Sequence, residues 1–349
     1  MTQSIVRELV YYGKHKKFDF FKVHPISSIY FGGGTPSILP IEDIAKILET
    51  IYENYSVAEN PEITLEANPD DLTPDYCQQL NTKGINRLSI GIQSFFEEHL
   101  KWMNRSHNAL QAETCVNNAV DAGIKNISID LIYGFPGLSN DQWLANLQIA
   151  QNFPINHLSC YCLTVEERTP LKKLIETKRY LPTDEHLAAK HFNMLSNWTA
   201  ANHWEHYEIS NLCRNGFYSK HNTAYWQQEP YLGIGPSAHS YNGLERRWNV
   251  KDNNAYIENW QIDKPLFEIE LLTPTNKLNE YILTALRTCW GLNLDHANEL
   301  ANINFMETKM DLIKKYSALN LLTLDKNCIK LTNEGRLFAD GIAADFFVN

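Results

Sequence analysis

The most constraining feature of this 349-residue sequence is the alternation of short β-rich runs with amphipathic helical segments, at a spacing of about 30–40 residues. Apolar and β-branched runs indicate six strands, the last of them weak: 26–31, 62–66, 87–92, 126–130, 157–162 and 207–210. Such repeats favour a parallel sheet covered by helices, which places the chain in the α/β class. A partial (β/α) barrel and an open, doubly wound sheet both fit this pattern.

The segments between these strands carry helix signals. In 41–55, one face of the helix carries Ile44, Ile47, Leu48 and Ile51. Thr73-Pro74 marks one helix start, and Ser139 with Gln142 fits a capping box at another. The predicted helices of this part are 41–55, 74–83, 109–122, one that follows Ser139, and 184–202.

The sequence changes character after Pro230. Residues 231–239 (YLGIGPSAH) form a glycine-rich loop, and the remainder reads as helix, helix, hairpin and helix, at 279–288, 306–319, 321–331 and 332–347. This order predicts a small winged-helix-like α+β domain. We therefore expect two domains, a barrel over 1–230 and the loop with the C-terminal domain over 231–349.

Composition excludes several classes of protein. The formal net charge is −10, which disfavours general binding to nucleic acid. Winged helices often bind DNA, but this one is not obviously basic, so we expect no nucleic-acid partner. No run of about 18 apolar residues predicts a membrane span, and the first residues read as a helix rather than a signal peptide. Seven scattered cysteines, an odd number, favour a reduced cytoplasmic protein.

Polar residues that could bind a ligand stand at the ends of the predicted strands. Gly32-Gly-Gly-Thr35 follows the first strand, Glu66 and Gln93 end later ones, Asp130 interrupts an apolar run, and Arg105 follows a short helix. Glycines let a backbone approach a ligand closely, and a carboxylate or guanidinium can bond an amine, a ribose or a carboxylate. Each residue also has an ordinary structural reading, such as a tight turn, a helix cap or a surface ion pair.

Taken in order, Gly32-Gly-Gly-Thr-Pro36, Glu66, Gly91-Ile-Gln93, Asn104-Arg105 and Asp130-Leu-Ile-Tyr-Gly-Phe-Pro136 resemble the radical S-adenosylmethionine (SAM) enzymes of the oxygen-independent coproporphyrinogen III oxidase family. The resemblance runs from about residue 4 to the C-terminus. It implies a partial β/α barrel of radical SAM type, similar to a TIM barrel, followed by a helical domain. It also implies SAM-contacting residues: Gly33, Gly34, Thr35, Glu66, Gln93, Arg105, Asp130 and Thr164.

A second motif, His221-Asn-Thr-Ala-Tyr-Trp226, is similar to the signature of the haem-chaperone branch of that family. The resemblance implies that His221 contacts haem iron. The chemistry agrees, because a neutral imidazole is a good iron ligand and aromatic rings pack on a porphyrin face. His239 is the second choice as ligand and His206 the third.

Members of the family also carry Cys-x-x-x-Cys-x-x-Cys after their first strand, and its thiolates hold a [4Fe–4S] cluster. The present sequence has no such spacing, and its first cysteine is Cys77. We interpret Cys160 and Cys162 as small core residues of a strand. We expect the barrel's first strand and the cluster loop, about 30 residues by the repeat length, to precede the helix that begins near Ser4. Their absence would leave the next strand with an unpaired edge.

The missing cysteines predict that the chain as given is not competent for radical catalysis. The resemblance therefore favours a haem-binding chaperone that delivers haem to haem-requiring proteins, in a family whose cofactors are SAM and the cluster. The alternative is an enzyme that decarboxylates coproporphyrinogen III oxidatively to protoporphyrinogen IX, in a longer form of the chain. A scaffold without activity is a third interpretation. The sequence indicates neither the haem acceptor nor the oligomeric state.

Overall fold

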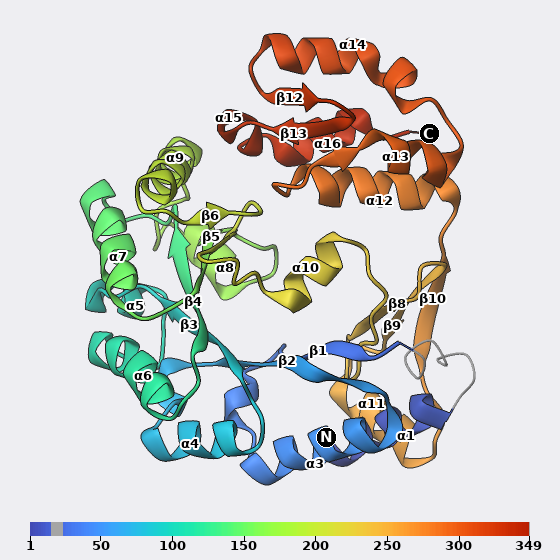
Figure 1. The fold of residues 1–349 in the computed structure, drawn as a ribbon. Helices are drawn as coiled ribbons and strands as arrows, with labels where there is room; N and C mark the ends of the chain where they lie inside the picture. Colours follow the sequence, from blue (N-terminus) through green and yellow to red (C-terminus); the bar gives the residue numbers. More distant parts are fainter. Residues whose placement is uncertain (15–23, 349) are drawn as a thin grey trace.

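The computed structural model describes residues 1–14 and 24–348, which form one large sheet, two small sheets and the helices around them (Figure 1). The large sheet has the order β1-β2-β3-β4-β5-β7-β6. Its strands are β1 (Ile26–Phe31), β2 (Val57–Ala67), β3 (Arg87–Gln93), β4 (Asn126–Tyr133), β5 (His157–Cys162), β6 (Glu205–His206) and β7 (Asn211–Cys213). From β1 to β5 the strands are parallel, whereas β7 is antiparallel to β5 and β6 to β7.

The order of the strands decides between the two architectures that the sequence left open. A doubly wound sheet reverses its strand order at a switch point. Here each strand from β1 to β5 pairs with the next one along the chain, so the sheet winds in one direction, as in a partial barrel. Within the described part of the chain, β1 pairs with β2 alone and lies at the edge of the sheet.

The five strong strand predictions are confirmed, and the weak one is wrong. Residues 207–210 form the turn between β6 and β7 rather than a strand of their own. The N–H groups of Tyr207 and Glu208 both donate to the carbonyl of Asn211, and the Glu208 carboxylate accepts from the Ser210 N–H. The side chain therefore stabilises a turn where the apolar pattern indicated an extended run.

Most helices of this part of the chain cover the outer face of the barrel sheet (Figure 1). Four residues that share one face of α3 are buried in the main core, as the periodicity predicted: Ile44, Ile47, Leu48 and Ile51. Thr73, Asn108 and Ser139 cap the helices that follow them with side-chain hydrogen bonds. The helices are α1 (Thr2–Lys14), α3 (Ile41–Asn54), α4 (Pro74–Thr82), α5 (Glu97–Trp102), α6 (Ala109–Asp121), α7 (Asn140–Asn152), α8 (Pro170–Glu176), α9 (Glu185–Ala201), α10 (Lys220–Trp226), and the short 3-10 turns η2 (Pro36–Ile38) and η3 (Pro69–Asp71).

A three-stranded antiparallel sheet follows the glycine-rich loop and was not predicted. It consists of β8 (His239–Tyr241), β9 (Glu245–Asn249) and β10 (Phe267–Leu271), with α11 (Asn253–Gln261) between the last two. Tyr256 and Trp260 of α11 pack into the barrel core, and Leu232 and Ile234 pack against it. The division of the chain at residue 230 stays a prediction.

The C-terminal part has a hydrophobic core of its own, which runs from Leu278 to Phe346. A small sheet of order β11-β13-β12 lies among its helices, and the predicted hairpin is its β12–β13 pair. The elements are α12 (Pro274–Leu286), β11 (Leu292–Asn293), α13 (Leu294–Ala301), α14 (Phe305–Ala318), β12 (Leu322–Asp325), β13 (Cys328–Leu331), α15 (Asn333–Arg336) and α16 (Ala339–Phe346).

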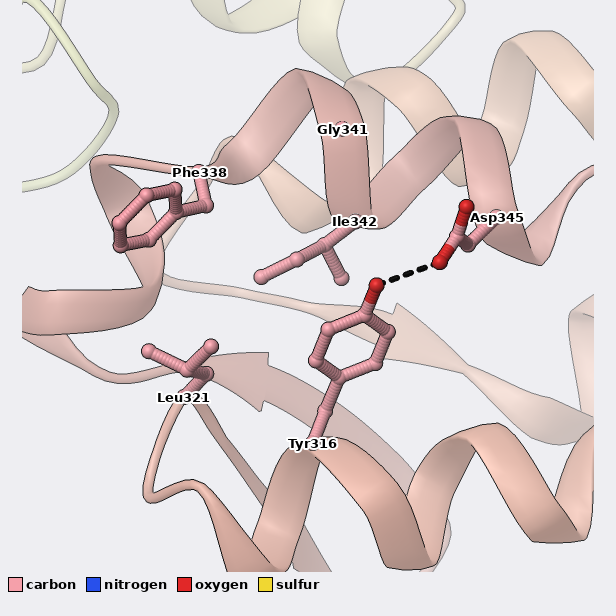
Figure 2. A pocket seen from close by; sticks show the side chains of 6 residues that line it. All are labelled: Tyr316, Leu321, Phe338, Gly341, Ile342 and Asp345. Carbon is pink, nitrogen blue, oxygen red and sulfur yellow. Dashed lines mark hydrogen bonds between the residues drawn. The ribbon is translucent and has the colours of Figure 1, made fainter.

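The predicted final helix is divided into α15 and α16 at Leu337 and Phe338. Gly335 packs so closely on the hairpin that an added Cβ would lie 1.8 Å from the carbonyl oxygen of Leu321. Phe338 in the break and Ile342 of α16 line a largely apolar hollow, in which the Tyr316 hydroxyl donates to Asp345 at 2.5 Å (Figure 2). The break therefore turns α16 onto α14.

Across the described residues, no helix is both long and apolar enough to cross a membrane.

Candidate functional site

The predicted ligand-binding residues gather where the parallel strands end. Gly32–Gly34 follow β1, Glu66 is the penultimate residue of β2 and Gln93 is the last of β3. Asp130 lies within β4, three residues before Tyr133 ends the strand. Because the carboxyl ends of parallel strands share one edge of the sheet, these residues come from distant parts of the chain to one place.

Glu66 fixes the loop after β1. One carboxylate oxygen accepts from the Tyr30 hydroxyl at 2.8 Å, and the other accepts from the Gly33 N–H at 3.2 Å. An added Cβ at Gly32 would lie 2.7 Å from the Tyr30 ring and 3.0 Å from Glu66 Oε1, so only glycine fits there. Glu66 therefore shapes the glycine loop instead of capping a helix or forming an ion pair.

The rest of the glycine loop leaves its backbone accessible. Among the residues that the structure describes, none lies within 4 Å of an added Cβ at Gly33 or Gly34, and Gly33 has a φ of +106°. Thr35 also has a left-handed φ, +38°, at the start of η2. Strained backbone of this kind persists where its surroundings hold it and is common at ligand sites. The loop can thus offer its N–H and C=O groups to a ligand.

Gln93 and Arg105 meet beside Gly91. An added Cβ at Gly91 would lie 2.9 Å from the Gln93 amide nitrogen and 3.4 Å from an Arg105 nitrogen. The same Arg105 nitrogen donates to Asn68 at 2.8 Å and to the Gly91 carbonyl at 3.2 Å. Arg105 Nε is buried without a partner among the described residues, and burial lowers the pKa of this guanidinium. Arg105 is therefore an inward-facing donor with an unsatisfied N–H, not a surface ion pair.

Asp130 and Thr164 occupy the other half of this edge. Burial raises the pKa of Asp130 to about 6, and the hydroxyl of Ser89 donates to the carboxylate at 3.3 Å. The charge of Asp130 acts on Arg105, and that of Glu66 acts on Asp130, so these groups share one electrostatic environment. Thr164 is exposed in the loop after β5, where its hydroxyl contacts the Cys162 carbonyl at 3.5 Å.

The motif of residues 221–226 forms the short helix α10, which packs on β1 and begins at the capping side chain of Ser219. The His221 N–H donates to Glu62 at 3.2 Å, and Nδ1 of its ring lies 3.2 Å from the Ser28 hydroxyl. The ring also stacks on Tyr30, with centroids 4.5 Å apart and planes 19° from parallel. Three contacts with β1 and β2 therefore hold His221 in place.

The surroundings of His221 keep its imidazole neutral. Removal from water, with a smaller contribution from the charge of Arg87, lowers the pKa of His221 to about 4. No hydrogen bond engages Nε2 within the described residues, and this nitrogen is not among their buried unpaired atoms. At neutral pH His221 can therefore offer a nitrogen lone pair to a metal.

The two other candidate histidines lie in different surroundings. His239 stacks on Trp248 in the small sheet, with ring centroids 5.9 Å apart. His206 Nε2 bonds the Ile209 carbonyl at 3.0 Å, and burial lowers the pKa of His206 to about 4. Within the described part of the chain, neither shares a contact with the residues around His221, so the structure does not bring the three histidines together.

Sequence reasoning missed Ser28 and Tyr30, which connect the two groups of candidates. Tyr30 contacts both Glu66 and His221, and Ser28 orients the His221 ring. Side chains two apart on a strand share a face, so Ser28 and Tyr30 lie on the face that leads to Gly32. That alternation was the only signal in the sequence that could have found them.

The described residues do not fit an iron–sulfur cluster. They contain no group of three or more histidine, cysteine or acidic side chains placed to hold a metal ion. Cys160 is buried as expected, but Cys162 is exposed, because it stands at the end of β5 beside the loop of Thr164. We therefore derive no chemistry from a cluster for these residues.

Comparison with known proteins agrees with this arrangement. The sequence profile of the Radical SAM superfamily matches residues 16–149, and that of the HemN C-terminal domain matches residues 272–338. A "Heme chaperone HemW" of Mycobacterium tuberculosis is 31% identical over 93% of this chain and 81% of its own length. The chain belongs to the HemW family of radical SAM proteins. The predicted family is thereby confirmed.

Further relatives agree with membership of the HemW family. A "Heme chaperone HemW" of Bacillus subtilis is 30% identical over 92% of this chain and 85% of its own length. The "Radical S-adenosyl methionine domain-containing protein 1, mitochondrial" of Danio rerio is 30% identical over 92% of this chain and 75% of its own. The coproporphyrinogen III oxidase HemN of Escherichia coli superimposes with a TM-score of 0.82 over 99% of this chain and 82% of its own, at 20% identity. This last likeness confirms the predicted fold.

Proposed function

We propose that this protein binds haem through His221 and delivers it to haem-requiring proteins. The names of its HemW relatives support that function, and so does the neutral imidazole of His221. His221 is neutral, its Nδ1 faces the Ser28 hydroxyl, and no hydrogen bond within the described residues occupies Nε2. Histidines that bind metals usually donate their second ring N–H to a nearby oxygen, which fixes the tautomer and leaves the other nitrogen for the metal.

Aromatic side chains beside His221 provide a surface for a porphyrin. The Tyr225 ring stands at 90° to the His221 ring with centroids 4.8 Å apart, and Tyr225 is 42% exposed. Trp226 ends the same helix and is half-buried. Flat aromatic rings contribute large apolar areas to such contacts at little cost in side-chain entropy. Haem, held by its iron, would pack against this helix.

The strand-end residues fit SAM, and we propose that they bind it. The glycine loop offers accessible backbone, Glu66 and Asp130 offer carboxylates, and Arg105 has an unpaired buried N–H. Gln93, Thr35 and Thr164 complete the proposed set. In radical SAM proteins a bound cluster supplies the electron that cleaves SAM, but the described residues do not fit the cluster. Oxidative decarboxylation is therefore not the function that this site supports best.

Replacing His221 tests the haem proposal. His221→Ala removes the only neutral imidazole that is held on α10, so haem affinity should fall by about tenfold or more and the Soret band should shift. The change is measured by absorption titration of purified protein with haem. His296→Ala, at an exposed position of α13, is the matched control and should leave both readings unchanged. An unaltered spectrum and affinity in His221→Ala would remove this residue from the haem site.

A further inference from the structure

A hollow of about 380 Å³ lies between the β6–β7 turn and the C-terminal core. Its wall combines two arginines and one carboxylate, that of Asp340, with apolar side chains. The charged residues are Arg287, Arg336 and Asp340, and the apolar ones include Ile209, Leu337 and Phe338. Cations beside apolar surface are suited to an amphipathic anion. The hollow lies outside the residues that the proposed haem and SAM contacts use.

Arg336 brings a guanidinium with free donors to this hollow. Among the described residues, no hydrogen bond or ion pair engages its side chain, and burial lowers the pKa of this group. Its electrostatic neighbours are Glu208 and the thiol of Cys289. The Glu208 carboxylate, however, already accepts from the Ser210 N–H and the Asn211 amide. A half-buried guanidinium in this state has unused donors for an incoming carboxylate.

Arg287 connects the hollow to α10. Its guanidinium carbon lies 5.8 Å from the centre of the Trp226 ring, and Trp226 is the last residue of α10. His221 stands five residues earlier, about 7.5 Å along the helix axis. Arg287 also pairs with Asp340, whose side chain is 73% exposed. Because the carboxylate of this pair is largely in solvent, the pair contributes little, and Arg287 can exchange Asp340 for another carboxylate.

We propose that this hollow binds a propionate carboxylate of haem, so that Arg336 and Arg287 hold the polar edge of the porphyrin whose iron His221 binds. The inference rests on the proposed haem function and deepens it. Guanidinium donors match the geometry of a carboxylate, and a propionate projects from an otherwise apolar ring. Ile209, Leu337 and Phe338 supply the apolar contacts that this edge requires.

The neighbouring hollow in Figure 2 has the opposite character. It shares Phe338 and Gly341 with the first but contains no cation, and its only charged lining residue, Asp345, is held by Tyr316 and lies near Lys315. Among the described residues, this second hollow has no lining cation to offer to a carboxylate. The anion site is therefore limited to the side of Phe338 where the two arginines lie.

Haem and haem dimethyl ester, titrated in the same detergent buffer, test the proposal, because the ester keeps the iron and the ring but lacks both carboxylates. The protein should bind haem about tenfold more tightly than the ester, as expected for hydrogen bonds to a charged group. In Arg336→Gln the ratio of the affinity for haem to that for the ester should fall towards one. In Arg336→Lys the ratio should fall to an intermediate value. Lys125→Gln removes one positive charge from an exposed turn before β4 and should keep the full preference.

Two results would overturn this inference and leave the haem function intact: equal affinities of the unaltered protein for haem and its ester, or an equal loss for both ligands in Arg336→Gln. Stabilisation by sodium propionate alone, abolished in Arg336→Gln while haem and ester bind equally, would assign the site to free anions instead. The comparison of the two ligands uses the unaltered chain, so it stands even where a variant does not fold. Failure of the unaltered chain to bind either ligand would overturn the haem function itself.

Discussion

At the scale of single residues, Tyr30 is the side chain that joins the proposed SAM and haem contacts. Its hydroxyl bonds Glu66, 36 positions away, and its ring stacks on His221, which comes from a helix far along the chain. The sequence predicted Glu66 and His221 because each belongs to a recognisable motif. It did not predict the roles of Tyr30 and Ser28, because strand alternation places them on one face but does not say which helix the fold lays over β1.

Tyr30→Phe separates the two contacts of this residue. The variant keeps the stacked ring but removes the donor to Glu66, so we expect the free energy of unfolding to fall by about 1 kcal/mol. Urea unfolding measures the change, with Tyr52→Phe, the same change at an exposed position of α3, as control. Equal midpoints for Tyr30→Phe and the unaltered protein would show that the Glu66 bond adds nothing to stability.

At the scale of elements, a buried carboxylate anchors α1. Glu8 accepts hydrogen bonds from the hydroxyl of Tyr256 on α11, the Asn249 amide of β9 and the Gly235 N–H of the glycine-rich loop. Burial raises the pKa of Glu8 to about 7, against the opposing effect of Arg247. Tyr12 and Tyr55 are the other titratable groups near it. Three elements therefore meet on one carboxyl group that favours its neutral form.

This anchor predicts a pH dependence of stability. The folded-state pKa of Glu8 is raised above its unfolded value of 4.5, so its contribution is fully present below pH 4.5 and is lost as pH rises to about 7. The loss is on the order of 3 kcal/mol. Unfolding free energies of the unaltered protein and Glu8→Gln, measured from pH 4.5 to 7.5, should diverge accordingly. Parallel curves for the two proteins would contradict this account.

Comparison of the helices and strands shows which of them a sequence can predict. The five parallel strands carry short runs rich in apolar and β-branched residues, and several of the helices between them carry side-chain caps, so local patterns sufficed for both. The β8–β10 sheet was not predicted from the sequence, because strands such as Glu245–Asn249 (ERRWN) have no apolar alternation. These strands form because they pair with one another. The division between α15 and α16 depends on the contact of Gly335 with Leu321, which no local pattern encodes.

At the scale of the whole molecule, two hydrophobic cores meet around residues 207–218 and 287–290. Ile209 packs against both cores, and the Cys289 N–H donates to the Tyr207 carbonyl at 2.8 Å. The Trp290 ring lies 6.1 Å from that of Tyr207 and 5.9 Å from that of Tyr218. The hollow of Arg287 and Arg336 lies along this contact, so its shape depends on how the cores are joined.

Trp290→Ala should loosen this contact without unfolding either core. Removing a half-buried aromatic ring should cost about 2 kcal/mol. Hydrogen exchange should accelerate in residues 205–213 and 287–290 while β1 to β4 stay protected. Leu283→Ala, at an exposed position of α12, is the control. Uniform acceleration over the whole chain would show instead that the two cores unfold as one unit.

The two contacts of Tyr30 connect ligand binding at the glycine loop with ligand binding at His221. A ligand that draws Glu66 away from the Tyr30 hydroxyl changes the free energy of the stack on which His221 rests. Thermodynamic reciprocity then requires that filling of the His221 position alter the affinity at the glycine loop by the same factor. Cargo and cofactor would titrate as coupled equilibria, and the coupling would be carried by a single phenol.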